Sequence, residues 1–176
     1  MSYMESLKKN SVPSARKVRS QPISAGEVRN ISGSVSMGSL ADSLGFAIRK
    51  AQLYAFQEFS RFMTEFNIRP AQFALLVLMA ENPGLSQSAA GLALSIEKGN
   101  LTGLLLELQH AGLIRRKQLA TDRRVFALHL TVKGKTLLER LLQRHEEYEQ
   151  ELASNLSRSD AGTLVALLKS LVAGPA

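Results

Sequence analysis

The stretch that decides the fold covers residues 112–134 and reads GLIRRKQLATDRRVFALHLTVKG. Two short apolar runs, Leu113–Ile114 and Val125–Leu130, flank a segment that is rich in basic residues. In the second run every other residue, beginning at Phe126, is large and apolar, which is the period-2 pattern of a half-buried strand. The stretch therefore predicts a short β-hairpin with a basic tip.

The basic residues expected at this tip are Arg115, Arg116, Lys117, Arg123 and Arg124. Arginine carries five donors in a fixed geometry and a permanent charge, which suits contacts with phosphates or entry into a nucleic-acid groove. Basic hairpin tips also occur in proteins that bind no nucleic acid. This feature alone therefore leaves both interpretations open.

Two helical patterns precede the hairpin, and a short break separates them. The first runs from Ser86, a plausible N-cap, to about Leu94. The second runs from about Glu97 to His110, and Gly112 follows it as a helix stop. Its apolar stripe has the i, i+3, i+4, i+7 spacing of a helix that faces a core, and it consists of Leu101, Leu104, Leu105 and Leu108.

The other faces of the second helix carry short or polar residues near its N-terminus, where the recognition helix of a helix-turn-helix contacts base edges. Helix, short turn, helix and basic hairpin, in this order, predict a winged helix-turn-helix over residues 70–131. Asparagine can pair with adenine, and lysine can reach guanine or a phosphate. The candidate DNA contacts of the two helices are Ser86, Gln87, Lys98, Gly99, Asn100 and Thr102.

Long helices are expected on both sides of this unit. Residues 40–67 have two apolar faces, which need two partners, such as the chain's own domain and a second subunit. Pro70 opens a helix to about Glu81, Thr131 caps a long helix, and a last helix covers about residues 159–173. We therefore expect a mainly α fold with a small β-hairpin wing and a homodimer held by residues 40–67 and 135–173.

The chain resembles the MarR (multiple-antibiotic-resistance regulator) family over about residues 40–173. The most specific part is an Asp-x-Arg wing at Asp122–Arg124, followed by a Leu-x-Leu-Thr-x-x-Gly motif that ends at Gly134. Further matches are Leu85-Ser86-Gln87, Gly99-Asn100-Leu101-Thr102, Leu108 and Gly112-Leu113-Ile114. Departures from the family pattern are Gly99, Gly103 and the pair Ala90-Gly91.

This resemblance implies a symmetric dimer that binds a pseudo-palindromic operator in double-stranded DNA and releases it when a small, often aromatic or phenolic, ligand binds. It also implies that Asp122 orients the wing and that Arg124 or Arg123 probes the minor groove. The departures at Gly99 and Gly103 affect positions where many members carry side chains that contact bases.

One face of the first helix places Arg49 among Phe46, Leu53 and Phe56, and aromatic walls with a few polar groups suit a ligand pocket. We therefore expect a small aromatic or anionic effector, or its thioester, at this face, with Tyr54 and His145 as further lining residues. Two alternatives remain open. The face can be packed core with Arg49 in solvent, and His145 can be a core or interface histidine.

Composition limits the classes of function. The net charge of +7 and the pI of about 10.0 suit a polyanionic partner. Without cysteines there is no disulfide or thiolate metal site, and the spacing of the three histidines suggests no metal ligands. We find no nucleotide-binding loop, catalytic triad, membrane span or signal peptide, and we expect a cytoplasmic non-enzyme without cofactor.

Residues 1–39 form a Ser-rich tail with six Lys or Arg residues and two Glu residues. Its composition is typical of a disordered segment, although a basic arm could also contact phosphates or a partner subunit. Two functions remain for the whole chain. The first is a ligand-responsive DNA-binding regulator, most often a repressor. The second is a winged-helix interaction module that no longer reads an operator.

Overall fold

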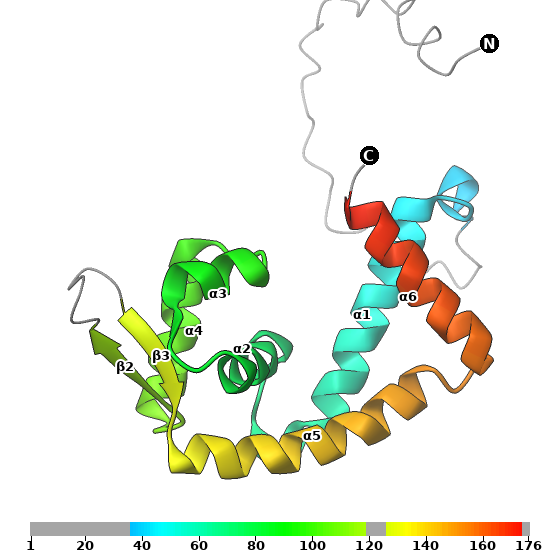
Figure 1. The fold of residues 1–176 in the computed structure, drawn as a ribbon. Helices are drawn as coiled ribbons and strands as arrows, with labels where there is room; N and C mark the ends of the chain where they lie inside the picture. Colours follow the sequence, from blue (N-terminus) through cyan, green and yellow to red (C-terminus); the bar gives the residue numbers. More distant parts are fainter. Residues whose placement is uncertain (1–35, 119–125, 174–176) are drawn as a thin grey trace, which may run out of the picture. The chain divides into compact units, whose positions relative to one another are not determined.

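Every helix that the apolar periodicity predicts is present in the computed structural model, which describes residues 36–118 and 126–173 (Figure 1). Residues 39–176 group as one compact unit. The helices are α1 (Leu44–Phe62), α2 (Pro70–Glu81), α3 (Gln87–Ala93), α4 (Lys98–His110), α5 (Val132–Leu152) and α6 (Arg158–Ala173). The strands are β1 (Leu85–Ser86), β2 (Ile114–Gln118) and β3 (Phe126–Leu130), and η2 (Gly38–Leu40) and η3 (Thr64–Phe66) are short 3-10 helices.

The first long helix is shorter than the predicted range 40–67. It ends at Phe62 and is followed by η3, after which Asn67 adopts a left-handed backbone conformation with φ of 50°. Arg69 is extended, as expected for a residue that precedes a proline. The local backbone at these two residues therefore separates α1 from α2, although the apolar pattern runs through to Phe66.

Three antiparallel strands form a small sheet in the order β1-β3-β2. β1 was not predicted, because two residues carry no periodicity. In the hairpin, Arg115 pairs with His129 and Lys117 pairs with Ala127. The prediction that Arg115, Arg116 and Lys117 lie at the tip is therefore wrong, because β2 extends to Gln118. The other three predicted wing residues, Asp122, Arg123 and Arg124, lie outside the described residues.

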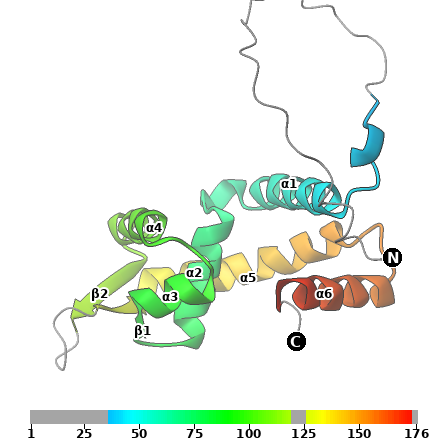
Figure 2. The ribbon, with the colours of Figure 1, turned by 90° about the horizontal axis from the view of Figure 1, so that it is seen from above.

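Helix α2 is at the centre of the fold (Figures 1 and 2) and contacts α1, α4, α5 and β3. It is apolar on several sides, and Leu75, Leu76 and Met79 are buried. A polar contact also connects its start to α4, since Nε2 of Gln72 donates to Glu107 at 2.8 Å. The leucine stripes of α4 and α5 complete the core with Leu101, Leu105, Leu108, Leu138 and Leu141.

The junction between the hairpin and α5 explains the Leu-Thr-x-x-Gly motif. The hydroxyl of Thr131 accepts a hydrogen bond from the Gly134 amide at 3.0 Å and donates to the Gly112 carbonyl at 2.7 Å. A Cβ on Gly134 would overlap the carbonyl oxygen of Leu113. The motif therefore caps α5 and allows the helix to approach the end of the hairpin closely.

Candidate functional site

Helices α3 and α4 form a tight pair. Ser86 caps α3, and its hydroxyl accepts from the Ala89 amide at 3.1 Å. The turn to α4 passes through Ser95, which has φ of 51°. A Cβ on the buried Gly91 would lie 3.1 Å from a methyl group of Leu101. The family departure at Gly91 thus occurs where α3 packs tightly against Leu101 of α4.

The first turn of α4 is exposed. Lys98, Gly99 and Asn100 are all exposed, whereas Leu101, Leu105 and Leu108 of the same helix are buried. A Cβ added to Gly99 or Gly103 would meet no atom within 4 Å. This turn therefore offers one lysine, one asparagine and bare backbone to an approaching partner.

Three predicted DNA contacts instead bond to one another. Nη2 of Arg116 donates to Oε1 of Gln87 at 2.8 Å, and Nε2 of Gln87 donates to Oγ1 of Thr102 at 3.2 Å. All three residues are half-buried. Arg115 and Lys117, the neighbours of Arg116 in β2, are exposed because successive side chains of a strand point to opposite faces.

A second candidate site is a mainly apolar cavity of about 510 Å³ between α1, α2 and α5. Its aromatic side chains include Phe56 from α1, Phe73 from α2 and His145 from α5. The rings of Phe73 and His145 stack with their centroids 4.6 Å apart. Nε2 of His145 lies 3.5 Å from a carboxylate oxygen of Glu149, which also borders the cavity, as does Glu81.

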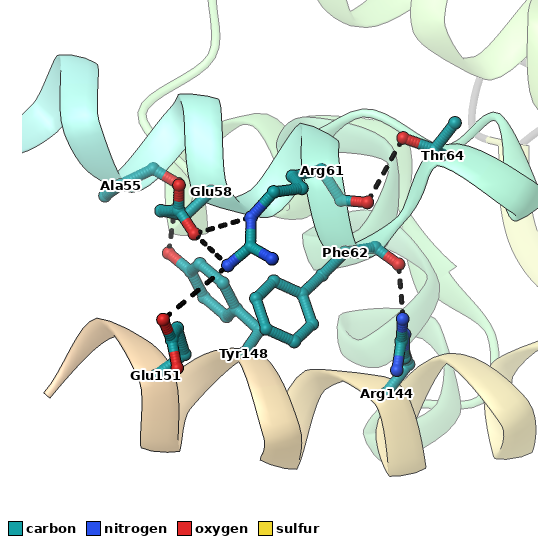
Figure 3. A network of polar contacts seen from close by, with 8 residues as sticks. All are labelled: Ala55, Glu58, Arg61, Phe62, Thr64, Arg144, Tyr148 and Glu151. Atoms are coloured by element: carbon teal, nitrogen blue, oxygen red, sulfur yellow. Dashed lines mark hydrogen bonds and ion pairs between the residues drawn. The ribbon is translucent and has the colours of Figure 1, made fainter. Parts of the chain in front are cut away.

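Tyr148 forms part of the cavity wall and joins α5 to α1 (Figure 3). Its hydroxyl donates to the Ala55 carbonyl at 3.3 Å, and burial raises the pKa of this hydroxyl above its ordinary value. One turn earlier in α5, Nε of Arg144 donates to the carbonyl of Phe62 at 3.2 Å. Two of the helices that bound the cavity, α1 and α5, are therefore joined by hydrogen bonds.

Only two of the six predicted effector residues, Phe56 and His145, line this cavity. The other four, Phe46, Arg49, Leu53 and Tyr54, are not among its lining residues. Arg49, Leu53 and Tyr54 are exposed, so the face that was predicted to surround a ligand is open. Phe73 was missed, because its place in the apolar stripe of α2 indicated only core.

Two kinds of site are absent from the described part of the chain. No three His, Cys, Asp or Glu side chains come together there as metal ligands. None of the described helices is both long enough and apolar enough to cross a bilayer.

Known proteins share this arrangement of helix pair and hairpin. The family model described as "MarR family" matches residues 66–125. A putative transcriptional regulatory protein for the hcr operon of Thauera aromatica is 38% identical over 135 residues, which cover 76% of this chain and 81% of the relative. The chain belongs to the MarR family of transcriptional regulators.

Solved structures of a MarR-family repressor agree with this assignment. The transcriptional repressor CouR bound to a 23-mer DNA duplex matches with a TM-score of 0.76 and 32% identity, over 80% of this chain and 99% of CouR. CouR bound to p-coumaroyl-CoA matches with a TM-score of 0.74 and 30% identity, over 79% and 98%. The predicted fold, a winged helix with flanking helices, is thereby confirmed.

Proposed function

We propose that this chain is a homodimeric repressor that binds a pseudo-palindromic DNA operator and leaves it when an aromatic acid or its thioester binds. The exposed first turn of α4 is the observation that carries the DNA-binding part. In a recognition helix these positions face the major groove, where Asn100 can pair with adenine and Lys98 with guanine or a phosphate. The DNA complex of CouR supports this role.

The wing supplies the remaining DNA contacts in this proposal. Arg115 and Lys117 are exposed on β2 and can approach phosphates. Asp122 orients the wing, and Arg123 or Arg124 enters the minor groove, as the family resemblance implies. The net charge of +7 attracts the polyanion over a longer range.

Two helices supply the proposed dimer contacts. No residue of α6 is buried, although Leu164, Leu167, Leu168 and Leu171 lie on it. Leu53 and Phe56 on α1 are also half exposed, at 49% and 50%. Exposed apolar side chains in such number are typical of an interaction site, and most soluble oligomers are symmetric homodimers.

The cavity between α1, α2 and α5 is the proposed effector site. Its volume of about 510 Å³ suits a small ligand, and Phe73 and His145 offer ring faces for stacking. Because the carboxylates of Glu81 and Glu149 border it, an uncharged aromatic ring fits better inside than an anionic group does. The complex of CouR with p-coumaroyl-CoA supports a thioester whose ring enters the cavity.

Release follows if the ligand prefers a different dimer geometry. The cavity is bounded by α1, which also carries proposed dimer contacts, and by α5, which continues from the wing. A ligand that shifts α1 against α5 changes the separation of the two recognition helices, which must match successive half-sites. The operator-bound population then falls.

The experiment begins with selection of an operator from random DNA, followed by fluorescence anisotropy with and without aromatic acids and their coenzyme A thioesters. We expect nanomolar-range binding that at least one aromatic compound weakens. Asn100→Ala should cost about 1–3 kcal/mol of operator binding, as expected for loss of a bidentate base contact.

Ala74→Met tests the cavity, because Ala74 borders it and a longer side chain would occupy its volume. The variant should bind the operator normally and need a higher effector concentration for release. Arg49→Ala is the control, since Arg49 is exposed and outside the cavity lining. Absence of any selected sequence, or equal effector potency in Ala74→Met, would contradict the corresponding half of the proposal.

A further inference from the structure

Arg116 is the basic residue of β2 that points inward. Its Cα partner in β3 is the fully buried Leu128, and its guanidinium lies over the ring of Phe126 with 4.7 Å between the carbon Cζ and the ring centroid. The Nη2 atom donates to Gln87 at 2.8 Å. Its charge is therefore held against the protein, unlike the charges of Arg115 and Lys117.

Gln87 connects this arginine to the recognition helix. Its amide uses both ends, because the oxygen accepts from Arg116 and the nitrogen donates to Thr102 at 3.2 Å. The hydroxyl of Thr102 in turn donates to the carbonyl of Lys98 at 2.8 Å. These three hydrogen bonds, the wing–helix bridge, join β2 through the first residue of α3 to the first turn of α4.

We infer that Gln87 and Arg116 are positioning residues, which hold the wing at a set distance from the base-reading turn of α4, and that neither is a ligand of DNA itself. This inference rests on the proposed DNA-binding function. The wing and α4 must enter neighbouring grooves of one duplex, so their separation has to match the DNA. Small misplacements of a site cost much of its binding, and a side-chain amide bonded at both ends limits them.

A direct phosphate contact is the competing role for Arg116. The residue borders a cavity of about 880 Å³ that Lys98, Ser88 and Ser95 also line. Its Nε atom is buried and has no hydrogen-bond partner in the part of the chain that the structure describes. An arginine that binds a phosphate and an arginine that positions the wing differ in one measurable respect, because only the first releases a counterion when the complex forms.

The test measures operator affinity as a function of salt for Gln87→Leu, Arg116→Met and the double variant. We expect each single variant to bind about 5- to 50-fold more weakly, the range of coupled neighbouring residues. The operator affinity of the double variant should be no lower than that of the weaker-binding single variant, because either change alone breaks the wing–helix bridge. The slope of log affinity against log salt should stay that of the unmodified chain.

Two further variants separate positioning from a loss of folding. Thr102→Val keeps the shape of the side chain and removes only the hydroxyl, so it should weaken binding as Gln87→Leu does, with an unchanged unfolding midpoint. Gln109→Leu makes the same replacement at an exposed position near the other end of α4 and should leave affinity unchanged.

Three results would overturn the inference while leaving the proposed function intact. They are unchanged affinity in both single variants, additive losses in the double variant, and a salt slope that falls by about 0.9 in Arg116→Met, which marks a lost phosphate contact. If the unmodified chain selects no operator, the proposed function fails, and the inference fails with it.

Discussion

At the scale of single residues, glycines have opposite roles at two positions of this chain. Gly134 is buried under the Leu113 carbonyl, and only a residue without a side chain lets α5 begin so close to the hairpin. Gly103 lies on the exposed side of α4, with no atom within 4 Å of an added Cβ. The first glycine is needed for packing, whereas the second only weakens its helix.

Gly134→Ala should therefore lower the free energy of unfolding by about 1–3 kcal/mol, since the new methyl group overpacks the junction. Gly103→Ala should raise it by roughly 0.5–1 kcal/mol through helix propensity. Urea unfolding followed by circular dichroism measures both. Equal stability of Gly134→Ala and the unmodified chain would show that α5 can move away from the hairpin at no cost.

At the scale of elements, the contact between α1 and α5 combines packing with a few polar links. The rings of Tyr148 and Phe59 form an edge-to-face pair with their centroids 5.5 Å apart. The Tyr148 hydroxyl also bonds to the backbone of α1 (Figure 3). Arg61 extends this contact toward Glu151 at 3.8 Å, but both charges are largely exposed and contribute little. The aromatic contacts and the tyrosine hydrogen bond therefore hold this pair of helices.

Tyr148→Phe should cost about 0.5–1.5 kcal/mol of stability at neutral pH, the net value of one hydrogen bond. Because burial raises the pKa of Tyr148, the folded state keeps its proton at pH values where the unfolded state has lost it. This contribution is complete below a pH of about 10, the ordinary tyrosine pKa, and declines as the pH rises above it.

Urea unfolding midpoints between pH 7 and pH 11 measure this expected loss of stability at high pH. The unmodified chain should lose stability above pH 10 more steeply than Tyr148→Phe. Tyr54→Phe, which removes a hydroxyl from an exposed position of α1, is the control and should follow the unmodified chain. Parallel curves for the unmodified chain and Tyr148→Phe would contradict the assigned cause.

At the scale of the whole molecule, the stripe of α5 that was expected to contribute to the dimer packs mostly within one chain. Leu138, Leu141 and Tyr148 are buried against the chain's own elements. The apolar surface left for a partner is therefore concentrated on α1 and α6.

The double change Leu167→Glu/Leu171→Glu should convert the dimer into a folded monomer, because it places two charges in the proposed interface. Leu142→Glu introduces the same residue at an exposed leucine of α5 and should leave the dimer intact. Sedimentation at micromolar concentration measures the mass, and circular dichroism confirms folding. Operator affinity should fall when the dimer is lost, since a monomer can contact only one half-site. A dimeric double variant would exclude α6 from the interface.

Local pattern alone determined most of the elements. The leucine spacing of α4, the caps at Ser86 and Thr131 and the helix stop at Gly112 are properties of short segments, and each was predicted from the sequence. The Asp-x-Arg and Leu-Thr-x-x-Gly spacings were likewise sufficient for the family. The position where α1 ends was not predicted, because the apolar period of this helix continues through η3.

The tertiary structure decided which side chains work together. Arg115 and Arg116 are adjacent and equally basic, yet only the register of β2 on β3 turns Arg116 toward Gln87. The cavity joins Phe56, Phe73 and His145 from three helices, and Arg49 remains outside it. Helical periodicity describes the faces of one element, whereas a site depends on how the faces of distant elements meet, which is settled only when the whole core packs.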